Sequence, residues 1–148
     1  MKTNATITGP NGKVTLVFGI YGLKNFCKRL GCEPTVGSIL PALQGGTRLE
    51  AISEIIRSGM EQAAAESGET VFVSDFEACD VLESAKGDEA EAVIKAFLSS
   101  IVGEDYDTWY KRVTKQNKAA ETADTDEATS EKKSTQAGTK SKPKLTES

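Results

Sequence analysis

The spacing of apolar residues changes at Gly19, and this change separates a strand from a helix near the start of the chain. Apolar and polar side chains alternate over residues 13–18, which is typical of a β-strand with one buried face. Beyond Gly19 the apolar residues recur at every third or fourth position, which predicts an amphipathic helix that ends at Gly31. Its apolar positions are Ile20, Leu23, Phe26, Cys27 and Leu30.

A second β-prone run precedes this strand. It begins near Asn4 and leads into Pro10-Asn11-Gly12, a combination that favours a tight turn between two strands. The pattern predicts a β-hairpin with its turn at Asn11-Gly12 and its second strand over residues 13–18.

Three apolar stripes between residues 47 and 103 predict further helices. The first begins at Thr47, which forms a capping-box pattern with Glu50. Its stripe is Leu49, Ile52, Ile55, Ile56 and Met60. Gly59 is unfavourable inside a helix, and we expect it to mark a close contact with another helix.

The second and third stripes follow a short β-prone run, residues 70–73, which is either a third strand or an extended lead-in. Ser74 and Glu77 form another capping box, and Asp88 is the expected cap of the third helix. The second stripe is Phe76, Cys79 and Leu82. The third stripe is Val93, Ile94, Phe97, Leu98 and Ile101.

The end of the chain differs in composition. Tyr106, Trp109, Tyr110 and Val113 share one face of a predicted helix of about two turns. From Thr114 onward the chain is polar, and Leu145 is its only large aliphatic residue, which predicts disorder. The sequence therefore predicts an α+β, mainly α, domain over 1–113, with a hairpin and four to five short helices, and a disordered tail over 114–148.

Composition excludes several classes of function. The 148 residues contain no histidine and three cysteines, with a formal net charge of −4. Histidine-based catalytic or metal sites are excluded, and the acidic balance is unlike that of a nucleic-acid binder. Because Cys27, Cys32 and Cys79 form an odd set without paired spacing, we expect a reducing cytoplasm. The polar N-terminus and the lack of a long apolar run predict no signal peptide and no membrane span. We expect no catalytic residues, no metal and no cofactor.

Two groups of side chains are candidates for partner binding. Lys24, Lys28 and Arg29 form a basic patch, which is either a solvated helix end or a docking surface for an acidic partner. The aromatic residues Tyr106, Trp109 and Tyr110 are of the types that dominate interface energetics. They either pack on the domain's own core or contact another subunit.

This order of elements resembles the tail assembly chaperones of long-tailed, siphovirus-like bacteriophages. The resemblance covers about residues 5–102. Four segments carry it: the strand-to-helix segment 18–31 with its basic Leu-Gly ending, the helix 49–60 ending in Ile55-Ile56 and Ser58-Gly59, the segment 71–77, and the acidic-starting helix 88–100.

The resemblance implies a non-enzymatic protein that binds the phage tape-measure protein and helps to recruit tail-tube subunits. It further implies action in the bacterial host's cytoplasm and absence from the mature virion. Self-association into a homo-oligomer would raise avidity for a long client. The alternatives are a small acidic adaptor or regulatory binding module, and a structural tail or head-completion subunit of the virion.

Overall fold

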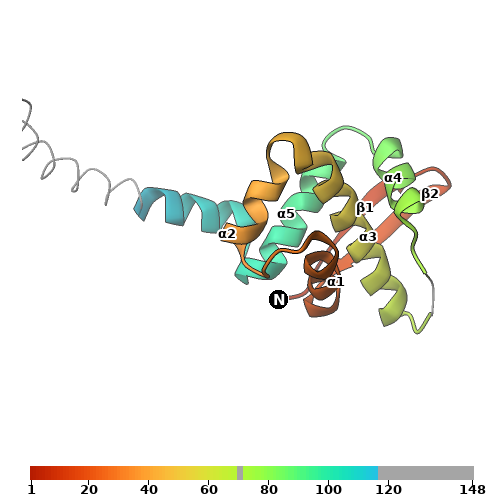
Figure 1. Ribbon diagram of the computed structural model, residues 1–148, viewed down its shortest axis with the longest axis horizontal. Coiled ribbons are helices and arrows are strands. Elements are labelled where there is room, and N and C mark those ends of the chain that lie inside the picture. Colours follow the sequence, from red (N-terminus) through yellow and green to blue (C-terminus); the bar gives the residue numbers. More distant parts are fainter. Residues whose placement is uncertain (70–71, 117–148) are drawn as a thin grey trace, which may run out of the picture. The chain divides into compact units, whose positions relative to one another are not determined.

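The computed structural model describes residues 1–69 and 72–116 and confirms the predicted α+β, mainly α fold (Figure 1). An N-terminal hairpin precedes a series of helices. The elements are β1 (Thr3–Gly9), β2 (Gly12–Phe18), α1 (Ile20–Leu30), α2 (Val36–Ile39), the 3-10 turns η1 (Leu40–Leu43) and η2 (Gly45–Thr47), α3 (Arg48–Glu66), α4 (Asp75–Ser84) and α5 (Glu89–Val102). A further helix covers 106–116.

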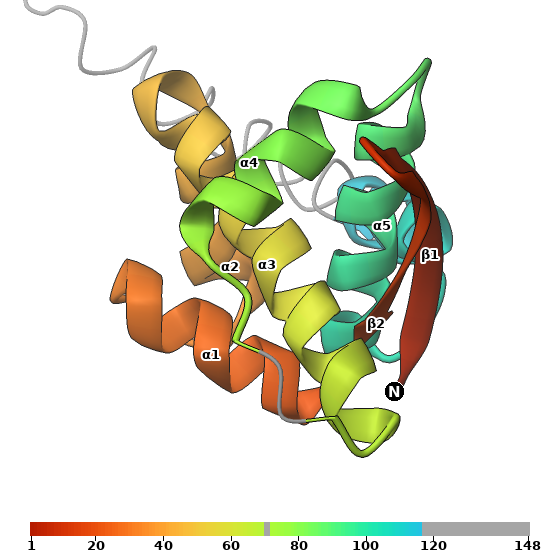
Figure 2. The same ribbon diagram turned by 90° about the vertical axis from the view of Figure 1, so that its right-hand side faces the viewer.

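The chain divides into two units, Met1–Trp109 and Tyr110–Ser148. The tail predicted from Thr114 lies outside the described residues except for 114–116, and its disorder stays a prediction. In the first unit the hairpin lies against α3 and α5, while α1 and α4 pack against α3 (Figure 2).

The hairpin forms as predicted, with its turn one residue earlier than expected. β1 and β2 are antiparallel, and Gly9 faces Gly12 across a two-residue turn at Pro10-Asn11. Ile7 is opposite Val14 and Ala5 is opposite Leu16. These side chains share the face that α3 and α5 cover, because alternate residues of a strand point to the same side.

Three phenylalanines from three elements join the hairpin to the helices. Phe97 of α5 lies 5.6 Å from Phe18 of β2 in an edge-on arrangement and 4.8 Å from Phe26 of α1, measured between ring centroids. All three rings are almost fully buried. Such aromatic contacts add to the free energy gained by burying the rings, so this cluster fixes the strand and both helices around one core.

Gly59 marks a close contact, but with a strand rather than with the helix that the sequence suggested. A Cβ atom at Gly59 would lie 2.8 Å from Phe18 Cε1 and 2.9 Å from Leu16 Cβ. α3 therefore approaches β2 closely because this position has no side chain, which offsets the unfavourable helix propensity of glycine.

The capping boxes predicted at Thr47 and Ser74 have different outcomes. At Ser74 both hydrogen bonds with Glu77 are present, as expected. At Thr47 the prediction is wrong, because the Thr47 hydroxyl donates instead to the carbonyl oxygen of Ala42 at 2.9 Å. The preceding 3-10 turns place that carbonyl within reach, which the local motif did not indicate.

Two predicted apolar faces are also partly wrong. Leu49 is 71% exposed and Phe76 is 76% exposed, whereas Ala78 and Val81 form the buried face of α4. Helix periodicity groups side chains on one face, but it does not say which of two apolar faces a neighbouring element covers. Of the run 70–73, residues 70–71 lie outside the description, and 72–73 are not a strand.

The start of α5 is held to the hairpin by Glu89 rather than by the expected Asp88 side chain. Asp88 is the N-cap residue but makes no side-chain capping bond. The Glu89 carboxylate accepts hydrogen bonds from the Lys86 amide at 2.9 Å and from the amide and hydroxyl of Thr8, each at 3.0 Å. These bonds, with that from Lys13, lower the pKa of Glu89 from 4.5 to about 2.

Candidate protein-binding surfaces

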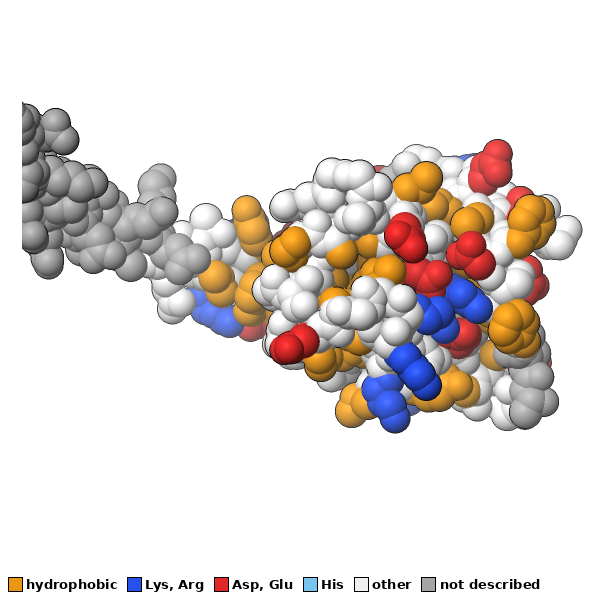
Figure 3. All heavy atoms as spheres, in the orientation of Figure 1, with side chains coloured by type: hydrophobic (Ala, Val, Ile, Leu, Met, Phe, Trp, Pro, Cys, Tyr) orange, Lys and Arg blue, Asp and Glu red, His pale blue; other side chains and the backbone are white. Residues whose placement is uncertain are grey.

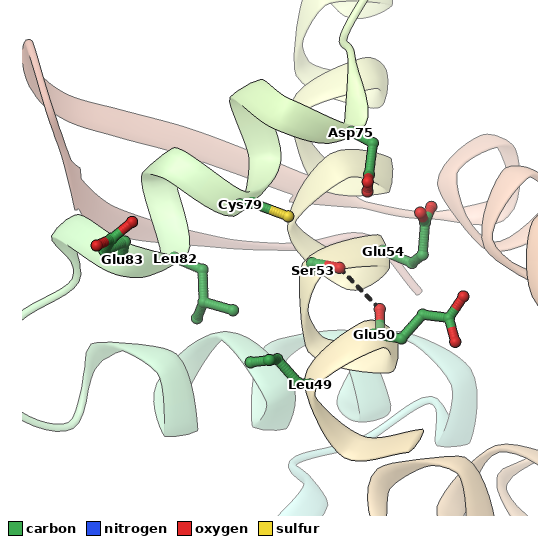
Figure 4. Close-up of a pocket in the computed structure, with 8 residues that line it drawn as sticks. All are labelled: Leu49, Glu50, Ser53, Glu54, Asp75, Cys79, Leu82 and Glu83. Atoms are coloured by element: carbon green, nitrogen blue, oxygen red, sulfur yellow. Dashed lines mark hydrogen bonds between the residues drawn. The ribbon is translucent and has the colours of Figure 1, made fainter. Parts of the chain in front are cut away.

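A groove lies between α3 and α4 in the first unit. It has a volume of about 700 Å³. Figure 4 shows Leu82 and Cys79 directed from α4 toward α3, where Leu49 and Ser53 lie. The remaining lining residues are acidic: Glu50, Glu54, Asp75 and Glu83. An apolar floor with polar groups at its margin is the usual composition of a binding groove.

The acidic residues of the groove differ in whether they have partners within the chain. Glu54 is paired with Arg29 and Arg57. Across the described ranges 1–69 and 72–116, Glu50, Asp75 and Glu83 have no side-chain hydrogen bond or ion pair. Three carboxylates are therefore available at the margin to attract a cationic partner.

A second apolar surface lies on the outer side of α1 and has the opposite charge. Ile20 is 77% exposed and Tyr21 is 51% exposed. Lys24 and Lys28 lie beside them, and the hollow that they line with Leu23, Asn25, Cys27 and Pro34 has a volume of about 650 Å³. It shares no lining residue with the groove. Figure 3 shows a face on which acidic side chains gather above a band of basic ones.

Arg29, the third member of the predicted basic patch, points toward α3 instead of lying on this surface. Its guanidinium donates to the carboxylates of Glu54 and Glu61 and, at 3.2 Å, to the Ser58 hydroxyl. Burial alone would lower the pKa of Arg29, but its bonds to Glu61 and Glu54 outweigh this effect and raise it. Arg29 therefore joins α1 to α3, and Lys24 and Lys28 are the exposed residues of the patch.

The predicted aromatic residues are placed in different surroundings. Tyr106 packs against the core, and its amide donates to the Ser99 hydroxyl at 2.8 Å. Trp109 is partly buried, with its ring 5.7 Å from that of Tyr106. Tyr110, which is 52% exposed, begins the second unit. Tyr106 therefore packs on the domain's own core, whereas partner binding by Trp109 and Tyr110 stays a prediction.

The three cysteines are free thiols in different surroundings. Burial, and then a hydrogen bond with Cys32, raises the pKa of the Cys27 thiol to about 12. A thiol with such a pKa is protonated at neutral pH and is a poor nucleophile. Cys79 lies exposed in the groove, contrary to the expectation that it packs in the core. Within the described ranges no three histidine, cysteine or acidic residues are grouped as metal ligands.

Sequence reasoning missed the groove because it assigned Leu49, Cys79 and Leu82 to buried faces. One signal was available in α4, where Phe76, Cys79 and Leu82 lie on one side and Ala78 and Val81 on another. A short helix with two apolar sides can bury only one of them against α3 and β1.

No protein-family model, curated protein or solved structure matches this chain. Among the described residues, no helix combines the length and apolar character that crossing a membrane requires.

Proposed function

We propose that this protein is a non-enzymatic tail assembly chaperone of a long-tailed bacteriophage. It binds the tape-measure protein during tail morphogenesis, keeps it soluble and helps to recruit tail-tube subunits. It acts in the cytoplasm of the bacterial host and is absent from the mature virion. Several copies bound along one client would gain affinity through avidity.

The observation that carries this proposal is the presence of two separate apolar surfaces with opposite charge. The groove between α3 and α4 has carboxylates without a partner in the described part of the chain, whereas the outer side of α1 has Lys24 and Lys28. A chaperone that brings two clients together needs two distinct surfaces, and opposite charges favour different partners. We assign the groove to the helical tape-measure protein.

The residues that line the groove suit one amphipathic helix of a client. Helix-in-groove recognition uses apolar anchors on one side of the bound helix, and Leu49 and Leu82 supply an apolar floor. Basic residues at the margins of the client helix would meet Glu50, Asp75 and Glu83. Because such contacts are individually weak, they allow the chaperone to leave the finished tail.

The absence of histidine and the raised pKa of Cys27 support a binding role rather than catalysis. General acid-base and nucleophilic catalysis depend on groups whose pKa lies near the working pH or is lowered by a neighbour. The proposal therefore includes no cofactor or metal.

Affinity capture from phage-producing cells, with purified particles analysed in parallel, tests this function. We expect the tagged protein to recover the tape-measure protein and to be absent from the particles. A variant with Glu50→Lys and Glu83→Lys should recover much less, while Lys111→Glu with Lys115→Glu, outside both surfaces, serves as a charge-reversal control. Persistence in particles, or recovery of neither tape measure nor tube, would contradict the proposal.

A further inference from the structure

The register of the hairpin shows which backbone groups of β2 point away from β1. The amide of Thr8 in β1 donates outward, to the carboxylate of Glu89, rather than to β2. Thr8 and the residue opposite it, Lys13, are therefore a pair without mutual hydrogen bonds, and such pairs alternate with bonded ones along an antiparallel ladder. The N–H and C=O groups of Lys13, Thr15 and Val17 accordingly lie along the outer edge of β2.

Helix α5 covers the outer edge of β1, whereas the outer edge of β2 has no such cover. In addition to the bond at Glu89, the Thr3 hydroxyl of β1 donates to the carbonyl oxygen of Ala96 in α5 at 2.6 Å. Figure 2 shows β2 on the side of the hairpin nearer to α3. Within the described ranges 1–69 and 72–116, the outward backbone groups of β2 have no hydrogen-bond partner.

An uncovered edge of this kind is a template for a further strand. Neither a bulge nor a proline interrupts β2, which pairs with β1 without a break from Gly12 to Phe18. Thr15 is exposed and Val17 is half-buried, and both belong to the residue types that favour strands. The edge therefore lacks the usual features that prevent another strand from pairing with it.

The surface beside this edge is concave and largely apolar. Two hollows that share Val14 and Met60, here called the edge hollows, have volumes of about 300 and 240 Å³. The smaller one is also lined by Ala63 and Ala64 of α3 and by Val73. Since the side chains of a strand alternate between its two faces, every second side chain of an added strand would point into this surface. Small apolar side chains suit hollows of this size.

The edge hollows carry negative charge. Glu69 lines one of them and Asp80 the other, and neither carboxylate has a hydrogen bond or ion pair in the part of the chain that the structure describes. Lys13 is the basic residue at this edge, and its ammonium group is paired with Glu89 at 3.2 Å. The charges therefore favour a bound segment that has basic residues at its ends.

We propose that the outer edge of β2 binds an extended segment of a partner protein, which adds a third strand to the hairpin. The segment directs small apolar side chains into the edge hollows and places lysine or arginine near Glu69 and Asp80. Its backbone bonds with Lys13, Thr15 and Val17. In recognition by strand addition the backbone bonds supply affinity and the alternate side chains supply specificity.

This site is separate from the groove between α3 and α4. The edge hollows share no lining residue with that groove. The inference therefore goes beyond the proposed function and does not depend on it, because strand addition can be measured on the purified protein without any phage component.

A second copy of this chain is a less favourable occupant than an extended basic segment. Pairing of two β2 edges would bring Glu69 and Asp80 of both copies to one interface, where like charges repel. It would also bring α3 of each copy beside the other. A single extended segment has neither disadvantage.

Amide hydrogen exchange of the ¹⁵N-labelled full-length protein tests the inference at individual residues. The probe is a short capped peptide with a lysine at each end and alternating valine and threonine between them. In the free protein, the amides of Thr15 and Val17 should exchange fast, whereas those of Val14 and Leu16, which bond to β1, should exchange slowly. At a peptide concentration about ten times its dissociation constant, exchange at Thr15 and Val17 should slow about tenfold, because roughly one tenth of the molecules are then free.

Two controls separate strand addition from other binding. The same peptide methylated on its backbone nitrogens keeps its side chains and charges but loses its donors, and it should not slow exchange. Thr15→Pro removes a donor from the edge and should abolish the protection of Val17. Thr6→Pro, at the residue opposite Thr15 in β1, should leave that protection intact.

Charge reversal tests the assigned acids. Glu69→Lys with Asp80→Lys should weaken binding of the peptide about tenfold. Glu33→Lys with Glu91→Lys makes the same change in net charge at exposed positions outside the edge hollows, and this control should bind the peptide as the unaltered protein does.

Three results would overturn the inference. The first is unchanged exchange at Thr15 and Val17 at the highest soluble concentration of the peptide. The second is equal slowing by the methylated peptide. The third is exchange at these amides that is slow in the free protein and slows further as the protein concentration rises, which would place a second copy at the edge.

Discussion

Two sets of acidic side chains lie along α3, and they have different roles. Glu54 and Glu61 point toward α1 and Arg57, have side chains that are 9% and 15% exposed, and are paired with arginines. Glu50, one turn before Glu54, lines the groove and has no side-chain partner among residues 1–69 and 72–116, and the same holds for Asp75 and Glu83 of α4. The first set holds two helices together, and the second leaves negative charge available to a partner.

Acidic residues on the same helix can therefore serve either stability or partner binding. Partly buried ion pairs that lose one member leave an uncompensated charge, which is strongly destabilising. Exposed unpaired charges contribute little to stability but affect partner choice. The two sets should therefore respond oppositely to mutation, one through stability and the other through binding.

Removal of Arg29 should have the largest effect on stability. Arg29→Ala leaves Glu54 with the longer contact to Arg57 at 3.6 Å, and leaves Glu61 with Arg57 at 3.9 Å and a hydrogen bond from the Asn25 side-chain amide at 3.1 Å. We expect the free energy of unfolding to fall by about 3 kcal/mol, measured by urea denaturation. Lys28→Ala, one residue earlier but exposed, should change it by less than about 0.5 kcal/mol. Equal losses in the two variants would contradict the assigned role of Arg29.

Gly59→Ala should have the next largest effect on stability. The added methyl group would meet Phe18 and Leu16 at less than 3 Å, and such overpacking costs about 2 kcal/mol. Gly37→Ala is the matched control, because a Cβ atom in α2 at that position has no atom within 4 Å. The control should retain or slightly raise the melting temperature, and a similar response of both variants would show that the close approach to β2 is unimportant.

Acid should weaken the contact between α5 and the hairpin. The pKa of Glu89 falls from 4.5 to about 2 on folding, so its contribution is fully present above pH 4.5. That contribution is lost as the pH falls from 4.5 toward 2 and the carboxylate becomes protonated. Urea unfolding at several pH values should show a smaller loss over this window for Glu89→Gln than for the unaltered protein. An unchanged profile would contradict the assigned hydrogen bonds.

Charge reversal in the groove should have the smallest effect on stability. Glu50→Lys removes an acid from the first turn of α3, whereas Glu83→Lys adds a cation to the last turn of α4, and the two helix-dipole effects oppose each other. The double variant should unfold within about 0.5 kcal/mol of the unaltered protein, measured by urea denaturation. A larger loss would mean that these acids stabilise the fold, contrary to the comparison above.

Local signals in the sequence predicted where the elements lie better than they predicted which other parts of the chain these elements contact. The Pro10-Asn11-Gly12 turn and the Ser74-Glu77 capping box depend on neighbouring residues, and both form. The hydroxyl of Thr47 found a competing carbonyl across the preceding turn, which the motif could not reveal.

The groove and the Arg29 cluster depend on contacts between distant segments. Glu50 and Glu83 line the same groove only because α3 and α4 pack together, and Arg29 reaches Glu54 and Glu61 from another helix. Periodicity grouped apolar residues into stripes, but it did not show that Leu49 and Phe76 stay exposed or that Ala78 and Val81 form the buried face of α4. Which acidic residues line the groove without a partner in the described residues can therefore be seen only in the folded structure.

Solubility of the tape-measure protein when produced together with this chain is the most direct test of the chaperone account. The account predicts that the unaltered protein raises the soluble fraction of its client. It also predicts that the Glu50→Lys, Glu83→Lys variant, equally abundant and equally stable, does not. A client that stays insoluble with the unaltered protein, or is solubilised equally by both, would contradict the account.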